Sequence, residues 1–267
     1  KANQDFPLKL SETGLFSSVK DHDVAPGVTA YRINAEPWAD HTLADRYIAL
    51  PGTSQLGIHK SSNAQVGNLK GEWSFPTDSV LMKTISLEME VGNPRSQRRL
   101  ETQILHRDGD TWRAYSYIWK DDQTDAVLSP GQGLDRTFTV ADPRVPGGRR
   151  NQVWHFASRT ECILCHTTRA GTVHGFRIDQ LNNSDQGNDD GLDQLNLLSE
   201  LNLFSEPLFA GKPRNKWPRI VSPSDESADI NLRARAYLHV NCAHCHRRGG
   251  GGTAAIDVQF QHSIEKT

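Results

Sequence analysis

The four cysteines of this 267-residue chain lie in two copies of one pattern, C-x-x-C-H. The first copy is Cys162-Ile163-Leu164-Cys165-His166, and the second is Cys242-Ala243-His244-Cys245-His246. In one helical turn, positions i, i+3 and i+4 lie on the same face, so each copy presents two thiols and one imidazole together. The spacing therefore allows two sulfurs and one nitrogen to hold a single bound group.

This pattern is the attachment signature of c-type haem. Two thiols add to the vinyl groups of the porphyrin, while the imidazole that follows them binds the iron. We therefore expect two covalently attached haems c, with His166 and His246 as the proximal metal ligands. The cofactor-binding residues would be Cys162, Cys165 and His166 for the first haem, and Cys242, Cys245 and His246 for the second.

Two other uses of paired cysteines fit less well. Zinc sites built from two C-x-x-C pairs have roughly 15 to 20 residues between the pairs, whereas here the whole stretch 166–241 separates them. Disulfides within the pairs are an alternative, but no thioredoxin-like βαβ pattern surrounds either pair. The His that follows both pairs favours haem over either alternative.

The sixth, distal ligand of each iron is left open by the sequence. A distal ligand needs a thioether or an imidazole. Either type of side chain has an ordinary structural use, Met as a core residue and His as a surface or supporting group. The candidates are Met82, Met89, His155, His174, His239 and His262.

Charge and hydropathy exclude several partners. The 30 Lys and Arg residues are balanced by 32 Asp and Glu residues, so no excess of positive charge favours nucleic acid or an anionic membrane. The mean hydropathy is −0.60, and no apolar run reaches the 18 residues of a membrane span. The first residues, KANQDFPLKL, contain neither an initiator Met nor an apolar signal core, which suggests a processed or excised chain.

The pattern over residues 1–147 predicts a β-rich domain. Aromatic and β-branched runs, separated by turn formers, occur at 47–50, 80–89, 100–106, 112–119 and 137–140. Asp108-Gly109-Asp110 predicts a hairpin turn. Leu100 and Ile104 are expected on one strand face and Glu101 and Gln103 on the other, as in a sheet with one side in water. We expect an antiparallel β-sandwich.

Residues 148–267 are expected to form a mainly α-helical, cytochrome c-like region, which gives an α+β fold class. The boundary is placed near DPRVPGGRR, at residues 142–150, because its Pro, Gly and Arg content is typical of a linker or exposed loop. Leucines at 192, 195, 198 and 201 predict a short packed helix. A second helix is expected from Ser224 or Asp225 to Cys242.

Several longer stretches resemble a family of bacterial dihaem c-type cytochromes. The similar stretches are LSETGLF, PWAD to RYIALPG, GEWSFPTDSVLMKT, RRLETQILHRDGDTWRAYSYIWKDDQTDAVL, ASRTECILCH and ARAYLHVNCAHCHRRGGGG. The resemblance implies a periplasmic location, or another outside the cytoplasmic membrane. It also implies a redox partner, sometimes a fused or neighbouring domain similar to quinone-dependent (PQQ) sugar dehydrogenases. Family members continue past the second motif through a Met-Pro loop, so we expect residues 148–267 to be C-terminally incomplete.

The function expected from these observations is electron transfer, from a quinoprotein dehydrogenase to a downstream acceptor. A first alternative is a dihaem peroxidase or oxidase, in which one iron keeps an open distal position. A second alternative is a β-sandwich binding module tethered to a cytochrome, with aromatic side chains lining a sugar surface. Those side chains would be Trp38, Trp73, Trp112 and Trp119.

Overall fold

The computed structural model describes residues 6–58, 72–183, 193–208, 213, 216–254 and 256–262. The chain divides into two compact units. Unit 1 comprises residues 1–30, 39–50 and 77–162, and unit 2 comprises residues 31–38, 51–76 and 163–267. The boundary predicted between residues 147 and 148 falls inside unit 1, and the division of the chain into domains stays a prediction.

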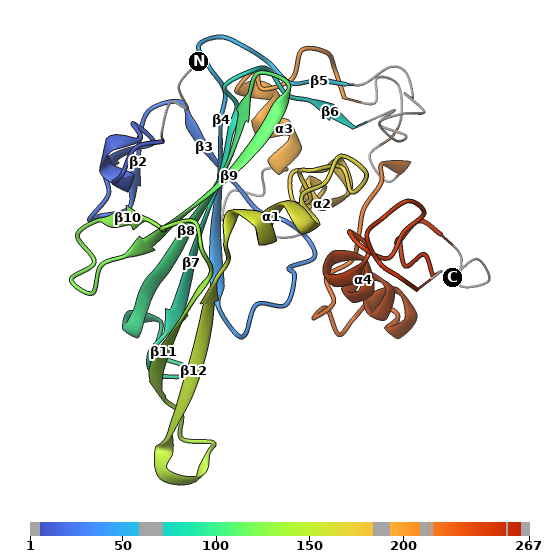
Figure 1. The fold of residues 1–267 in the computed structure, drawn as a ribbon. Coiled ribbons are helices and arrows are strands. Elements are labelled where there is room, and N and C mark those ends of the chain that lie inside the picture. Colours follow the sequence, from blue (N-terminus) through green and yellow to red (C-terminus); the bar gives the residue numbers. More distant parts are fainter. Residues whose placement is uncertain are drawn as a thin grey trace. The chain divides into compact units, whose positions relative to one another are not determined.

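The elements follow one another along the chain as shown in Figure 1. The strands are β1 (Phe16–Ser18), β2 (Asp23–Val24), β3 (Val28–Tyr31), β4 (Leu43–Ala49), β5 (Gly57–Ile58), β6 (Trp73–Ser74), β7 (Val80–Glu88), β8 (Gln97–Asp108), β9 (Thr111–Trp119), β10 (Ala126–Leu128), β11 (Leu134–Ala141) and β12 (Arg149–Phe156). The helices are α1 (Arg159–Cys165), α2 (Ile178–Leu181), α3 (Gln194–Glu200) and α4 (Ile230–Cys242), and short 3₁₀ turns occupy Leu10–Glu12, Pro94–Ser96 and Pro146–Gly148.

Unit 1 is built on a six-stranded sheet with the strand order β10-β9-β8-β7-β4-β3. The pairs β10–β9, β9–β8, β8–β7 and β7–β4 are antiparallel. Strands β8 and β9 form a hairpin in which Asp108 pairs with Thr111. Gly109, in the turn, has a φ of +57°, a conformation that glycine adopts without steric cost. The hairpin predicted from Asp108-Gly109-Asp110 is confirmed.

The predicted assignment of side chains to the faces of β8 was wrong, because the strand contains a bulge. The pairing between β7 and β8 shifts by one residue: Ile85 lies opposite Glu101, but Ser86 lies opposite Arg99. A one-residue insertion of this kind reverses which face the following side chains point to. Leu100 therefore packs in one apolar cluster and Ile104 in another.

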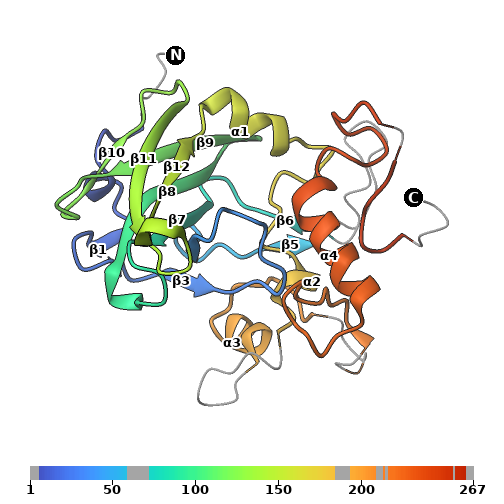
Figure 2. The same cartoon turned by 90° about the horizontal axis from the view of Figure 1, so that it is seen from below.

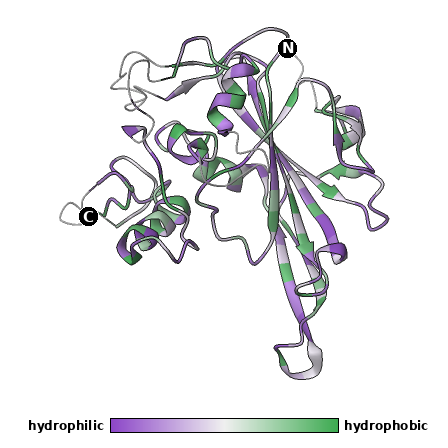
Figure 3. Cartoon of the chain, turned by 180° about the vertical axis from the view of Figure 1, so that it is seen from behind, coloured by the Kyte–Doolittle hydropathy of each residue, from purple (hydrophilic) through white to green (hydrophobic). Residues whose placement is uncertain are grey.

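Apolar residues cover the two faces of this sheet, and Figure 3 shows hydrophobic and hydrophilic bands along its long strands. The first cluster comprises Leu10, Leu15, Phe16, Val19, Met82, Ile104, Tyr115, Tyr117, Trp119 and Ala126. The second comprises Ile85, Leu87, Leu100, Ile118, Phe138, Val140, Trp154 and Phe156. The expectation of one side in water was therefore wrong, since the N-terminal segment packs on one face and the β11–β12 hairpin on the other.

Glu101 shows most clearly that both faces of the sheet are covered. It was expected on a solvated face, yet its exposed fraction is 0%. Its carboxylate accepts hydrogen bonds from Ser116 Oγ at 2.6 Å and from Trp154 Nε1 at 3.1 Å. These bonds satisfy a buried polar group and also connect β12 to the sheet.

The stretch 142–150 forms the end of the hairpin between β11 and β12. Asp142 accepts hydrogen bonds from Arg144 and Arg150, and these guanidinium groups hold the pKa of its carboxyl well below its usual range, with the bond from Arg144 as the main cause. The run of Pro, Gly and Arg thus forms a charged turn.

The predicted fold class was wrong, because the protein is mainly β and residues 148–267 are not mainly α-helical. Within the described part of the chain, α1 to α4 contain 7, 4, 7 and 13 residues. Prolines at 207, 213, 218 and 223 and glycines at 249–252 interrupt this region, and each disfavours a continuous helix. Figure 2 shows α4 with an irregular C-terminal segment running beside it.

The two helices predicted here were found with different bounds. In α3, Leu195 and Leu198 are fully buried, whereas Leu201 is half exposed at the helix end. Leu192, the first member of the predicted stripe, lies outside the described residues. The second helix, α4, begins at Ile230 and not near Ser224.

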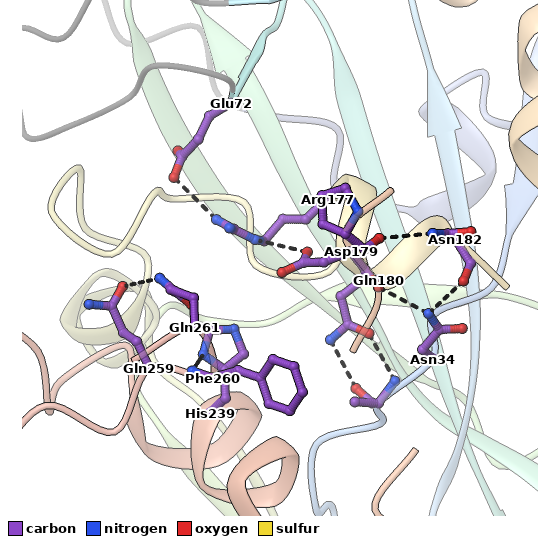
Figure 4. Close-up of polar contacts among 12 residues, drawn as sticks. Asn34, Glu72, Arg177, Asp179, Gln180, Asn182, His239, Gln259, Phe260 and Gln261 are labelled. Carbon is purple, nitrogen blue, oxygen red and sulfur yellow. Dashed lines mark hydrogen bonds and ion pairs between the residues drawn. The ribbon is translucent and has the colours of Figure 1, made fainter. Parts of the chain in front are cut away.

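Unit 2 is held together around α2 by buried polar side chains (Figure 4). Gln180 exchanges two hydrogen bonds with the backbone of Ala35, at 2.8 and 3.1 Å. The Asn34 amide donates to the carbonyl oxygens of Asp179 and Asn182, both at 3.0 Å. A small apolar cluster of Ala35, Ile220 and Ala236 packs α4 into the same unit.

Among the helices that the structure describes, none combines the length and the apolar character needed to cross a bilayer.

Candidate functional site

The first C-x-x-C-H motif begins on α1, and a capping box fixes where this helix starts. Ser158 Oγ accepts a hydrogen bond from the backbone N–H of Glu161, and the Glu161 carboxylate accepts one from the backbone N–H of Ser158. These bonds, together with His155, lower the pKa of Glu161 to about 2. The capping box therefore fixes the start of the helix that carries Cys162 and Cys165.

His166 follows α1 and is oriented by the loop after it. Its Nδ1 lies 2.6 Å from the carbonyl oxygen of Thr172. A carbonyl can only accept, so Nδ1 carries the proton, and in the neutral ring Nε2 is then the nitrogen with the lone pair. Thr172 has a φ of +47°, a left-handed conformation that is unusual for a β-branched residue. The backbone is thus held in a strained conformation where it orients His166.

The second motif lies at the C-terminal end of α4. Asp229 caps the start of this helix by accepting hydrogen bonds from the backbone N–H groups of Asn231 and Leu232. The helix ends at Cys242, and the N–H of His246 still donates to the Cys242 carbonyl at 2.8 Å. The helical turn therefore continues through the motif.

The four glycines at 249–252 fold back over the second motif. The backbone N–H groups of Gly250 and Gly252 donate to the carbonyl oxygens of Arg247 and Cys245. A Cβ on Gly250 would lie closer than 3.0 Å to the Cys245 carbonyl oxygen, and one on Gly252 would lie 3.0 Å from His246 Nδ1. At Gly250 and Gly252 a side chain would collide or press on the motif, so these two positions cover it closely.

Cys165 of the first motif lies beside the second motif in unit 2. The Sγ atoms of Cys165 and Cys245 and a ring nitrogen of His244 all lie within 4.8 Å of one another. None of the four cysteines forms a disulfide, and all are partly buried. Burial, and then the neighbouring Cys245, raise the pKa of the Cys165 thiol. Three soft donors are therefore gathered at one point, although the motifs are far apart in the sequence.

Three histidine rings are stacked beside this cluster. The ring centroids of His166 and His174 are 4.7 Å apart, and those of His174 and His244 are 5.7 Å apart. Burial lowers the pKa of His174 well below its usual value and lowers that of His244 as well. Both rings are therefore neutral near pH 7, the form in which imidazole binds metals.

Two buried ring nitrogens near the motifs have no hydrogen-bond partner within the described residues. These atoms are His174 Nε2 and His246 Nδ1. A buried polar atom without a partner costs free energy and is a sign of an additional group at the site. The sequence predicts His246 as a proximal ligand and offers His174 as a distal candidate, and both residues lie in unit 2.

Three of the distal-ligand candidates lie in unit 1 and are engaged elsewhere. Met82 is 2% exposed inside the first apolar cluster, and Met89 packs against the second. His155 has both ring nitrogens in use, with Nδ1 2.6 Å from Asp135 and Nε2 3.2 Å from Glu161. These bonds, the one to Asp135 first, raise the pKa of His155.

Two further candidates, His239 and His262, lie in unit 2 and also have partners. His239 Nδ1 accepts a hydrogen bond from the backbone N–H of Phe260, so its neutral ring carries the proton on Nε2 (Figure 4). His262 forms an ion pair with Asp257 at 3.2 Å. Of the six candidates, His174 is therefore the one with a buried, unpartnered nitrogen beside a motif histidine.

The tryptophans considered for a sugar surface do not share one environment. Trp119 and Trp73 are buried, with exposed fractions of 2% and 7%, whereas Trp38 is 55% exposed. Trp119 Nε1 donates to Thr102 Oγ1 inside unit 1. Trp73 stacks on Phe204 in unit 2 at a centroid distance of 4.8 Å. Trp119 and Trp73 are core residues and offer no surface to a glycan.

A cavity of about 280 Å³ lies in unit 2 and was not foreseen from the sequence. Its lining includes Trp73 and Phe176 as apolar walls and Arg177 as a cation. Arg177 pairs with Glu72 at 3.1 Å and with Asp179 at 3.3 Å (Figure 4). No local sequence signal could have shown this, because Glu72 and Arg177 are brought together only by the fold.

The residues of both motifs fit covalently attached haem. None of the four cysteines forms a disulfide, each motif lies in a helical turn, and the Thr172 carbonyl fixes the tautomer and direction of the His166 ring. Comparison with family models, with curated proteins and with solved structures found no match.

Proposed function

We propose that this chain is a dihaem c-type cytochrome that transfers electrons. The observation that supports it most directly is the orientation of His166, whose Nδ1 donates to a backbone carbonyl while two cysteines that form no disulfide precede it on the same turn. Iron-ligating histidines are held in this way, because the hydrogen bond fixes both the tautomer and the direction of the ring.

Each residue of the motif has a separate task in this proposal. Cys162 and Cys165 would anchor the first porphyrin, and Cys242 and Cys245 the second, each by adding a thiol across a vinyl group. His166 and His246 would bind the two irons. Haem supplies a one-electron couple, and the protein sets its potential through burial and hydrogen bonding.

We propose His174 as the distal ligand of the first haem, because its Nε2 is buried without a partner in the described residues. The His166 and His174 rings, whose centroids are 4.7 Å apart, would have to separate for an iron to bind between them. The pKa of His174 is well below the usual value, mainly through burial, so it is neutral over the range in which it would bind iron.

The donor and the location follow from the resemblance of the sequence. We propose a quinoprotein dehydrogenase, as a separate protein or a fused domain, as the source of electrons. We place the chain in the periplasm or elsewhere outside the cytoplasmic membrane, where c-type haem is attached in the family it resembles. A test is reduction of the ferric protein by a PQQ-dependent sugar dehydrogenase and its sugar.

The haem proposal is tested by producing the chain together with a bacterial haem-attachment system. We expect the intact mass to rise by two haems and the colour to remain with the protein after acid–acetone extraction. Replacing Cys162 and Cys165 by Ala should remove one haem, and replacing Cys242 and Cys245 the other. A colourless protein after extraction, or one that contains zinc and no iron, would refute the proposal.

The same material separates electron transfer from peroxidase or oxidase chemistry. Two low-spin haems would exclude a resting open iron. A high-spin haem that binds cyanide would favour catalysis instead. His174→Ala should convert one haem to the high-spin form, whereas His106→Ala, a control in unit 1 where His106 lies 3.4 Å from Asp78, should leave the spectrum unchanged.

A further inference from the structure

The meeting point of the two motifs is a metal-ligand cluster in its own right. Cys165 belongs to the first motif, whereas His244 and Cys245 belong to the second, and all three are in unit 2. Their donor atoms lie within 4.8 Å of one another, and each side chain is partly buried. His244 has no part in haem attachment, since it occupies a variable position of its motif.

The donor separations suit a small tetrahedral ion. With bonds of about 2.3 Å to sulfur and about 2.0 Å to nitrogen, the ligand atoms of a zinc site lie roughly 3.5 to 3.8 Å apart. The observed upper limit of 4.8 Å is larger than this by about one ångström, which small side-chain rotations can close. Thiolate and imidazole are soft or borderline ligands, so the set selects zinc over calcium or magnesium.

Neighbouring features hold the cluster in place from both sides. Cys165 is the last residue of α1, whose start is fixed by the capping box of Ser158 and Glu161. Cys245 is fixed by its carbonyl oxygen, which accepts hydrogen bonds from Arg247 and Gly252 N–H groups. The donors are therefore presented by ordered backbone.

We infer that, before haem is attached, the chain binds one zinc-class ion through Cys165, His244 and Cys245. The two thiols lose their protons as the ion binds, and a water molecule fills the fourth position. A thioether sulfur carries no negative charge, so addition of Cys165 or Cys245 to a vinyl group removes a thiolate from the ion. The site itself is independent of the proposed function, and only its displacement by haem rests on it.

The test uses the full chain, produced without haem attachment and kept reduced with a thiol-free reductant. Cobalt(II) is the optical probe, because thiolate ligands give it a charge-transfer band, and zinc is then titrated against a chromophoric chelator. We expect one ion per chain and displacement of cobalt by zinc. Absence of a thiolate band, or a stoichiometry of two, would overturn the inference.

Matched variants locate the site. Cys165→Ser, Cys245→Ser and His244→Ala should each weaken zinc binding by more than the roughly 10- to 100-fold that loss of a supporting group costs. Cys162→Ser and Cys242→Ser are the controls, since they lie in the same motifs but outside the cluster. Equal losses in all four cysteine variants would mean that each C-x-x-C pair binds metal separately.

The haem test and the metal test fail in different ways. Haem attachment needs all four cysteines and does not need His244, whereas the ion needs His244 and only Cys165 and Cys245. Tryptophan fluorescence and circular dichroism of each variant show whether it folds, so that weak zinc binding is read only from folded protein. Zinc should also slow haem attachment to the wild type more than to His244→Ala.

Discussion

Gly250 allows a sharp test of how the second motif is built. We predict that Gly250→Ala destabilises unit 2 and lowers attachment of the second haem. An added Cβ would collide with the Cys245 carbonyl oxygen and would lie 3.0 Å from Arg247 Cγ. The first of these contacts involves backbone, which cannot rotate away.

The size of the effect follows from the cost of forcing atoms into a packed site, typically 1 to 3 kcal/mol. A steric cost of about 2 kcal/mol shifts the equilibrium of the glycine run from its closed form toward an opened form by roughly 30-fold. Urea unfolding should show a lower midpoint with an unchanged slope. Intact mass should show a larger share of chains carrying a single haem.

Gly251→Ala is the matched control, because its added Cβ would meet nothing within 4 Å. Both variants add one methyl group to the same loop, so propensity effects are nearly equal. If Gly251→Ala destabilised the protein as much as Gly250→Ala, or if neither did, steric contact with the Cys245 carbonyl would not be what shapes this segment.

Three further predictions concern the core and the buried titratable groups. Glu101→Ala should lower the free energy of unfolding by about 3 kcal/mol in urea titrations, because the buried donors of Ser116 and Trp154 each lose their acceptor. Burial lowers the pKa of His239 to about 4, below its ordinary 6.5. Between these two pKa values the unfolded chain binds more protons than the folded chain, so the free energy of unfolding should fall by about 2 kcal/mol from pH 7 to pH 5. The fall should be smaller in His239→Gln. Met82→Ala should cost about 2 to 5 kcal/mol of stability and leave the haem spectrum unchanged, since Met82 is a core residue.

Each of these has a clear contrary outcome. Ser116→Ala, which removes one donor, should cost less than Glu101→Ala, and the opposite order would contradict the account of Glu101. A wild type whose stability is flat from pH 7 to pH 5 would mean that His239 titrates normally in the folded protein. A shift of either haem to high spin in Met82→Ala would make that residue an iron ligand.

Local signals predicted the long strands well. Residues 80–89 and 112–119 correspond closely to β7 and β9, because aromatic and β-branched runs ended by turn residues carry their own information. The bulge beside Glu101 carries no such signal. It reverses the order of faces in β8, so residues assigned by simple alternation ended on the wrong sides.

The helices show a different limit. Asp229 stands directly before Ile230 and is the true cap of α4, but Ser224 and Asp225 offered an equally good local signal. The choice among them depends on tertiary packing, such as that of Ala236 against Ile220. The expectation of a mainly helical region failed because a motif that needs one helical turn says nothing about the chain on either side.

The sequence predicts the two C-x-x-C-H motifs as candidate sites, but it does not predict that residues of the two motifs lie close together. The C-x-x-C-H spacing predicts both sets of candidate ligands at once, because they are local in sequence. The approach of Cys165 to Cys245 and the bond from His166 to the Thr172 carbonyl depend on how the intervening chain folds. Neither has a counterpart in spacing or composition.

The distance in sequence between Cys165 and Cys245 also has a consequence in time. A chain grows from its N-terminus, so the first motif is complete while the second is still unmade. During that interval Cys165 has neither Cys245 nor His244 beside it. The three-donor cluster can therefore assemble only after the second motif has been made.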